Sequence, residues 1–181
     1  MSFLNEEFRE LNNRSTLALL EFFCCNPFKS FYVREVARES GLSVGSCNSC
    51  LKFLAKKTFL TASRRGNQLH YKLNFLNPAV KQFRIFLSVL RVNKVVDAIK
   101  EYSEKVILYG SRAFGEETEG SDFDLFVLAK EVEDVKKIIS QKKFGKLSAL
   151  IVDGKRLLAL KTRERPFYDR IMSGIELWRF R

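Results

Sequence analysis

Residues 106–128 read VILYGSRAFGEETEGSDFDLFVL, and this stretch decides the fold of the second half of the chain. Lys105–Tyr109 is a short apolar run rich in β-branched residues, which predicts a buried strand. Gly110 and Ser111 end that strand and begin what we expect to be one helical turn. Free backbone N–H groups at such a turn suit a phosphate, because a helix N-terminus is electropositive. Arg112 would add a positive charge there.

A second strand is predicted at Asp122–Leu128, after an acidic loop. Because side chains alternate along a strand, Asp122 and Asp124 share one face, while Phe123 and Leu125 point the other way. The two carboxylates lie roughly 6.6 Å apart along a strand of ordinary rise. That separation allows both to contribute oxygen ligands to Mg²⁺ beside a triphosphate.

The Gly110-Ser111 turn, the loop and the Asp122-Phe-Asp124 pair together resemble the signature of the nucleotidyltransferase superfamily of DNA polymerase β type. The pattern is most similar to the minimal nucleotidyltransferase branch and covers about Lys105 to Trp178. The resemblance implies that Gly110, Ser111 and Arg112 bind the NTP, and that Asp122 and Asp124 are catalytic metal ligands for Mg²⁺ or Mn²⁺. In the two-metal scheme one ion activates the attacking oxygen and the other stabilises the leaving group. The alternative is an Asp-x-Asp pair in a solvated loop.

The third carboxylate of that family comes from the next strand, which we expect at Lys146–Val152. The matching position is Ser148, a hydroxyl without negative charge. Asp153 lies five residues further on, about 16 Å along an extended strand, and has the opposite parity. Two interpretations stay open: a domain that binds Mg-NTP with weak or no turnover, and a working nucleotidyltransferase.

Charge in the first half of the chain indicates a polyanionic partner. The 181 residues carry a formal net charge of +11, and no Asp or Glu occurs from Ser40 to Val96. The basic residues of that stretch are Lys52, Lys56, Lys57, Arg64, Arg65, Lys72, Lys81, Arg84, Arg91 and Lys94. A surface of one sign favours binding to nucleic acid. We find no signal peptide and no membrane-spanning run, and we expect a cytoplasmic protein.

A helix-turn-helix pattern precedes and overlaps this basic stretch. Helices are predicted at Arg14–Cys25, with Ser15 as its cap, and at Phe31–Ser40 and Ser43–Lys57, with Gly41 between the last two. Two alternating runs, Phe59–Ser63 and Leu69–Phe75, predict a hairpin with Arg64 and Arg65 at its tip.

Helices followed by a basic hairpin resemble a winged helix-turn-helix domain over about Arg14–Phe75. In that family the second helix of the motif enters the major groove of double-stranded DNA, and the wing contacts the backbone or minor groove. The resemblance implies these DNA-binding residues: Ser46, Asn48, Ser49, Lys52, Lys56, Arg64 and Arg65. A homodimer would suit a palindromic site. The alternatives are a module that binds only protein, and binding to RNA.

No zinc site is expected. Cys47 and Cys50 have zinc-like spacing, but Cys24 and Cys25 are adjacent and the only histidine is His70. Cys47 falls on the apolar face of its predicted helix, where a small hydrophobic residue is ordinary.

Together these patterns predict an α+β protein with an N-terminal winged helix domain, a long connecting helix and a small mixed-sheet nucleotidyltransferase-like domain. The expected ranges are 1–77, 78–103 and 104–181. The expected function is that of a DNA-binding transcriptional regulator whose second domain binds Mg-NTP. The alternative is an active nucleotidyltransferase that transfers NMP to a protein, as antitoxin-like relatives do, to nucleic acid or to a small molecule.

Overall fold

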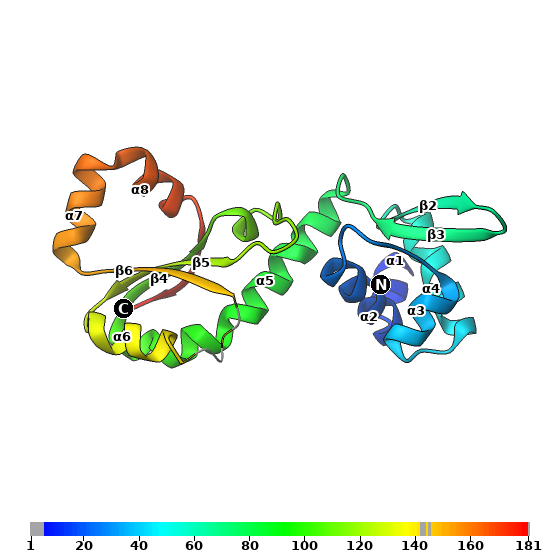
Figure 1. The fold of residues 1–181 in the computed structure, drawn as a ribbon, viewed down its shortest axis with the longest axis horizontal. Coiled ribbons are helices and arrows are strands. Elements are labelled where there is room, and N and C mark those ends of the chain that lie inside the picture. The colour runs from blue at the N-terminus through cyan, green and yellow to red at the C-terminus, as the bar shows by residue number, and fades with distance from the viewer. Residues whose placement is uncertain (1–5, 142–143, 145, 181) are drawn as a thin grey trace. The chain divides into compact units, whose positions relative to one another are not determined.

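Two units divide the chain, Met1–Val80 and Lys81–Arg181. The computed structural model describes residues 6–141, 144 and 146–180 (Figure 1). The first element is the short helix α1, Glu6–Leu11.

The first unit has the element order of a winged helix. After α1 come α2 (Arg14–Cys25), β1 (Ser30–Tyr32), α3 (Val33–Ser40), α4 (Val44–Lys56), β2 (Leu60–Arg65) and β3 (Gln68–Leu73). The three strands form an antiparallel sheet in the order β1-β3-β2. The winged helix prediction is therefore confirmed by this arrangement, with α3 and α4 as the helix-turn-helix and the β2–β3 hairpin as the wing.

Two local expectations in this unit are wrong. The cap of α2 is Asn13 and not Ser15 as predicted, since the Asn13 side-chain oxygen accepts a hydrogen bond from the Ser15 backbone N–H at 2.9 Å. The helix predicted from Phe31 begins only at Val33, because Phe31 lies in β1 opposite Tyr71 and is buried there. A three-residue strand is too short to show an alternating pattern, so tertiary pairing decides this segment.

The turn between α3 and α4 follows the expected chemistry. Gly41 ends α3 with a φ of 72°, a conformation that suits glycine. Ser43 caps α4, since its side-chain oxygen accepts a hydrogen bond from the Ser46 backbone N–H. Cys47 is fully buried beside Leu51 and Leu54, so it packs as a small hydrophobic residue.

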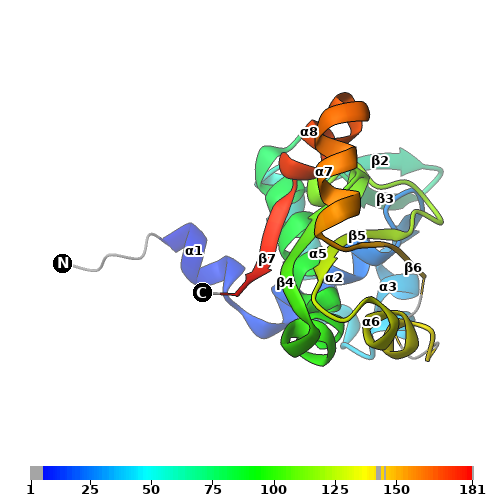
Figure 2. The same ribbon diagram turned by 90° about the vertical axis from the view of Figure 1, so that its left-hand side faces the viewer.

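The second unit is a mixed sheet with helices on both faces. Its elements are α5 (Pro78–Ile99, which begins in the first unit), η1 (Lys100–Tyr102), β4 (Ser103–Tyr109), η2 (Ser111–Ala113), β5 (Phe123–Ala129), α6 (Val132–Ile139), β6 (Leu147–Val152), α7 (Gly154–Arg163), α8 (Arg165–Met172) and β7 (Ile175–Arg179). The strand order is β6-β5-β4-β7, as Figure 2 shows, and only β5 and β6 run parallel.

Alternate residues of the central strands enter two cores. Val106, Leu108, Leu125 and Val127 pack with α5 and α6 on one face. Ile107, Tyr109 and Phe126 pack with α7 and α8 on the other. The central strands β4 and β5 are therefore buried on both faces, with helices on either side of the sheet (Figure 1), which explains their continuous apolar sequence.

The observed architecture confirms the α+β prediction: a winged helix, a long helix and a small mixed sheet. Within the described residues, no helix has the length and apolar composition needed to cross a membrane.

Candidate nucleotide site and nucleic-acid interface

Asp124 lies directly against the Gly110 turn. Tyr109, the last residue of β4, is paired across the sheet with Asp124 of β5. Gly110 has a φ of 71°, and a Cβ placed on it would overlap the Asp124 carboxylate oxygen Oδ2 and lie 3.1 Å from Cγ. Only glycine therefore allows the carboxylate to sit on this turn. The predicted juxtaposition of the acid with the glycine-serine corner is found in the structure.

Asp122 and Ser148 flank that carboxylate. Asp122 is exposed and precedes β5, which begins at Phe123. Phe123 and Leu125 pack into the core under α5 and α6, while Phe126 packs on the opposite face, so Asp124 belongs to the face of α7 and α8. Ser148 of β6 is the cross-strand partner of Asp124. The hydroxyl thus occupies the position beside the acid that the sequence assigns to the missing carboxylate.

The charge of Asp124 is poorly solvated. Burial raises the pKa of this carboxyl above its ordinary value, and the nearby negative charge of Asp122 raises it further. The positive charges of Arg170 and Arg112 oppose that shift in the pKa of Asp124. Burial also raises the pKa of Tyr109, and the charge of Asp124 adds to it. A bound cation would relieve the repulsion between the two carboxylates.

Tyr109 and Arg170 are neighbours of the acid pair that sequence reasoning missed. The Tyr109 ring packs edge-on against Phe167 of α8, with centroids 6.3 Å apart. The Arg170 guanidinium lies 5.1 Å from the Phe167 ring centroid. Tyr109 resembles any apolar strand residue, and Arg170 is 46 positions from Asp124, so only the packing of α8 on the sheet brings them to the site.

Arg112 holds the loop that carries Asp122. Its Nε donates to the backbone oxygens of Ser121 and Asp122 at 3.2 and 3.1 Å, and its second amino group donates to Ser121 at 2.7 Å. The guanidinium also lies 4.0 Å from the centroid of the Phe123 ring. These contacts position the loop, and the nucleotide-binding role of Arg112 stays a prediction.

A buried ion pair anchors the other side of the loop to α5. Arg84 is 3% exposed and donates to Glu117 Oε1 at 3.1 Å, to the Gly115 backbone oxygen at 2.8 Å and to the Glu117 backbone oxygen at 2.7 Å. Nearby, Lys81 pairs with Glu116 at the surface, 2.8 Å apart. Part of the basic run from Ser40 to Val96 is therefore balanced by acids of this loop and does not face a partner.

The donor set fits one divalent ion better than two. Among the described residues, no group of three His, Cys, Asp or Glu side chains could hold a metal. Mg²⁺ is commonly held by one or two carboxylates together with substrate phosphates. Asp122 and Asp124 would supply such carboxylates, and the Gly110-Ser111 turn lies beside them for a phosphate. A bound ion would supply charge neutralisation for the phosphates.

The second candidate surface is the outer side of α4 with the wing. Lys52, Lys56 and Ser49 are exposed, whereas Ser46 and Asn48 are half-buried. The Ser49 hydroxyl donates to the Gly45 backbone oxygen at 3.2 Å. Arg64 and Arg65 lie at the end of β2, opposite Leu69 and Gln68, and both are exposed. All seven predicted DNA-binding residues thus belong to one helix and the adjoining hairpin.

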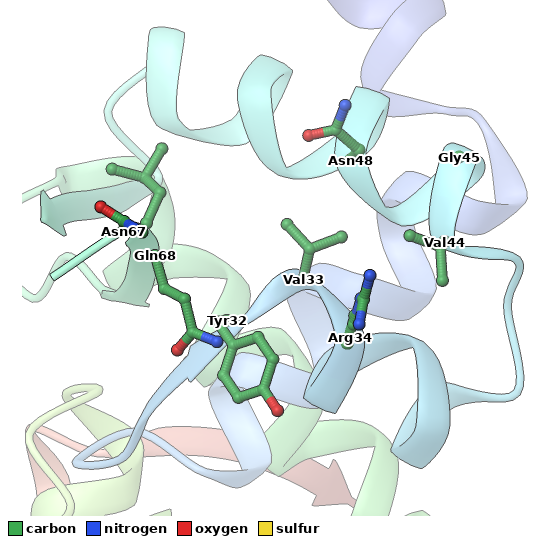
Figure 3. Close-up of a pocket in the computed structure, with 9 residues that line it drawn as sticks. Tyr32, Val33, Arg34, Val44, Gly45, Asn48, Asn67 and Gln68 are labelled. Atoms are coloured by element: carbon green, nitrogen blue, oxygen red, sulfur yellow. The ribbon is translucent and has the colours of Figure 1, made fainter. Parts of the chain in front are cut away.

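A pocket of about 600 Å³ lies between this helix and the wing (Figure 3). Asn48 is the only predicted DNA-binding residue that lines it. The remaining lining residues, which sequence reasoning missed, are Tyr32, Val33, Arg34, Val44, Gly45, Asn67, Gln68 and Leu69. They come from the junction of β1 with α3, from the first turn of α4 and from the hairpin, and only the fold places those segments together.

Comparison with known proteins agrees with the C-terminal fold. Residues 92–168 match the family model described as "Nucleotidyltransferase domain". This part of the chain is therefore a nucleotidyltransferase domain, which is the class of protein module that the turn, the acid pair and the mixed sheet define. The comparison with curated proteins finds no match.

Solved structures with partial similarity include a winged helix-turn-helix DNA-binding domain, the protein HlyU and a nucleotidyltransferase-like protein. A homodimeric winged helix-turn-helix DNA-binding domain from Mycobacterium bovis, described as a possible ArsR-family transcriptional regulator, is 18% identical over 46% of this chain and 73% of its own, with a TM-score of 0.38. HlyU from Vibrio cholerae is 20% identical over 45% and 81%, with a TM-score of 0.38. A candidate nucleotidyltransferase from Sulfolobus solfataricus is 21% identical over 55% and 83%, with a TM-score of 0.34.

Proposed function

We propose that the protein is a DNA-binding regulator whose nucleotidyltransferase domain binds Mg-NTP with weak or no turnover. The DNA-binding half of the proposal is supported by one observation above all. On the winged helix scaffold, the outer face of α4 and the tip of the wing carry Lys52, Lys56, Arg64 and Arg65, all exposed. No acidic residue occurs in the sequence of α4 or of the wing to oppose them. Such a surface attracts the phosphates of duplex DNA.

The nucleotide-binding half of the proposal is supported by the Gly110 corner. The Gly110-Ser111 turn opens the short helix Ser111–Ala113 and lies against Asp124, and Asp122 and Asp124 together are suited to one Mg²⁺, a combination that favours a nucleoside triphosphate. Ser148 in the place of a third carboxylate favours binding over turnover. We propose that Gly110, Ser111, Asp122 and Asp124 form this site.

Wing arginines provide the test of the DNA-binding proposal. The double substitution Arg64→Ala and Arg65→Ala removes two exposed cations, so affinity for duplex DNA should fall. The log–log salt slope should become shallower by roughly 0.9 for each DNA phosphate that the variant no longer neutralises. Fluorescence anisotropy of a labelled duplex at several salt concentrations measures both quantities.

Lys29→Ala is the matched control. Lys29 is exposed and directly precedes Ser30, which is paired with Lys72 at the end of the hairpin away from the Gly66 turn. The salt slope of this variant should equal that of the native protein. If the double variant keeps the native affinity and slope, the wing does not bind DNA.

An active nucleotidyltransferase is the second candidate function, because both Asp122 and Asp124 are present and Asp124 lies at the glycine corner. The acceptor of NMP would be a protein, a nucleic acid or a small molecule. Incubation of the protein with labelled NTP, Mn²⁺ and cell extract tests this candidate, and strong label transfer would favour it over binding alone.

A further inference from the structure

The pocket between α4 and the wing has a mixed lining that differs from a simple phosphate site. Its walls combine apolar side chains, Val33, Val44 and Leu69, with the amides of Asn48, Asn67 and Gln68. Figure 3 shows Asn48 on α4 and, across from it, Asn67 and Gln68 on the hairpin; all three line the pocket. Arg34 supplies a cation and the amides supply donors, but a pocket that only held phosphate would leave the apolar residues unexplained.

Val44 and Asn48 are arranged along α4 with the cations behind them. Val44, Asn48, Lys52 and Lys56 follow at intervals of four residues, so they form one row along the helix. Val44 is 50% exposed although it is apolar, and it lies in the first turn. A Cβ added at the neighbouring Gly45 would meet no described atom within 4 Å, so a ligand can approach the backbone closely there.

This order matches the way a recognition helix enters the major groove. Its N-terminal residues contact base edges, while the more distant cations contact phosphates. In the major groove an exposed methyl group marks thymine, and an Asn side chain pairs with the N6 and N7 atoms of adenine. Val44 offers the apolar contact and Asn48 the amide, one turn apart on the same row.

We propose that Val44 and Asn48 are specificity-determining residues that recognise an A·T pair in duplex DNA, Val44 through the thymine C5 methyl group and Asn48 through the adenine edge. This inference rests on the proposed DNA-binding function. The wing side of the pocket, with Asn67 and Gln68, contacts the same or the adjoining nucleotide. A preference for A·T therefore originates at the start of α4, separate from the sequence-independent attraction by Lys52, Lys56, Arg64 and Arg65.

The test begins with selection of bound sequences from a random duplex library by the full chain. The preferred duplex is then remade with uracil in place of each thymine in turn, which removes one methyl group and keeps all Watson–Crick pairing. We expect selected sequences to share an A·T pair and its replacement by A·U to weaken binding about fourfold per buried methyl group. In Val44→Ala the ratio of affinities for the two duplexes should fall to about one. In Asn48→Ala the preference for adenine over guanine should fall by at least about fivefold.

Leu76→Ala is the matched control, since Leu76 is 92% exposed and does not line the pocket. Its thymine-to-uracil ratio should equal that of the native chain. Because the uracil duplex is tested with the native protein, the result does not depend on how well a variant folds. Salt-dependent binding to duplexes without any effect of uracil, or an unchanged ratio in Val44→Ala, would overturn this inference alone. Failure to bind any duplex would overturn the proposed function together with it.

Discussion

Asp124 is the side chain at which the main features of the candidate nucleotide site meet. Its carboxylate rests on the Gly110 backbone, with Tyr109 paired on one side and Ser148 on the other. Burial and the charge of Asp122 both raise its pKa, so the charged form is held at a cost in folding free energy. A cation bound there, as proposed above, would offset this cost.

The raised pKa of Asp124 predicts how stability depends on pH. The folded state holds this proton more tightly than the unfolded state, so protonation at low pH stabilises the fold and the charged form destabilises it at neutral pH. Asp124→Asn should therefore raise the melting temperature at pH 7.5 by about 2–4 °C. The gain in melting temperature should shrink as the pH falls through the raised pKa of Asp124, because the native carboxyl then becomes protonated as well. Thermal melts from pH 4 to 8 measure this difference.

Asp169→Asn is the control for that experiment. Asp169 is exposed on α8 and accepts hydrogen bonds from Arg165 at 2.9 and 3.0 Å, so its replacement should give no gain at neutral pH. Equal melting curves for native protein and Asp124→Asn at every pH would contradict the stated destabilisation by Asp124.

Ser148 gives a second prediction at the scale of one residue. Ser148→Asp places a carboxylate beside Asp124 on the adjoining parallel strand. We expect Mn²⁺ to bind about tenfold more tightly, and metal-dependent label transfer from NTP to increase if the missing ligand limits catalysis. Isothermal titration with Mn²⁺ measures the first effect. Ser148→Asn introduces a side chain of the same shape as Asp but without its charge, so Mn²⁺ affinity should equal that of the native protein. Equal affinities of the Asp and Asn variants would refute the prediction.

At the scale of elements, α5 and the loop from Gly115 to Asp122 form one structural assembly. Arg84 binds the loop from the helix side, and Arg112 binds it from the turn side. Both guanidinium groups donate to backbone oxygens, so they fix the path of the loop and with it the position of Asp122. A substitution in α5 that removes these contacts should therefore change the position of Asp122 in the carboxylate pair.

The buried ion pair gives a prediction about stability. Arg84→Met keeps much of the side-chain volume but leaves Glu117 and two backbone oxygens without their donor. Removing one member of a buried pair costs about 3–5 kcal/mol, so unfolding by urea should occur at a much lower midpoint. Lys81→Ala is the control on the same helix and loop, because its pair with Glu116 is exposed and should contribute less than about 1 kcal/mol. Similar losses in the two variants would disprove the special role of Arg84.

Elements with a strong repeating pattern could be predicted from sequence, and elements decided by pairing could not. The helices α2 and α4 and the strands β4 and β5 follow from apolar periodicity or a continuous apolar run, and Gly41 and Ser43 predict the turn between helices. The strand β1 has three residues and exists because Phe31 pairs opposite Tyr71. The long helix ends at Ile99, and Ser103 already belongs to β4, where its hydroxyl donates to the Ile99 backbone oxygen at 2.8 Å.

The candidate site residues also divide into those that the sequence predicts and those that only the fold brings together. Gly110, Asp122 and Asp124 are close in sequence and belong to a recognisable spacing, so they could be proposed before the fold was known. Tyr109 and Arg170 have no such spacing, and the pocket at Val44 combines three separate segments. A count of charges along the sequence wrongly assigned Arg84 to a partner-facing surface, because Glu117, the acid that pairs with it, lies more than thirty positions away.

On the scale of the whole molecule, the chain joins a basic winged helix to a domain with an acid pair. The formal charge of +11 is therefore distributed unevenly: the stretch from Ser40 to Val96 has no acid, whereas the loop and strand at Glu116–Asp124 are rich in acids. These surfaces of opposite charge favour different ligands, a polyanion for the first unit and a cation with phosphate for the second.

The absence of a side chain at Gly110 has a consequence for ion choice. Since Gly110 has no side chain, only the main chain of the turn and the Asp124 side chain would set the spacing between an anion on the turn and an ion on the carboxylate. Mg²⁺ prefers oxygen distances of about 2.0–2.1 Å and Ca²⁺ about 2.3–2.6 Å. A Cβ at position 110 would occupy this space, so any discrimination by ionic radius would depend on the absence of that Cβ.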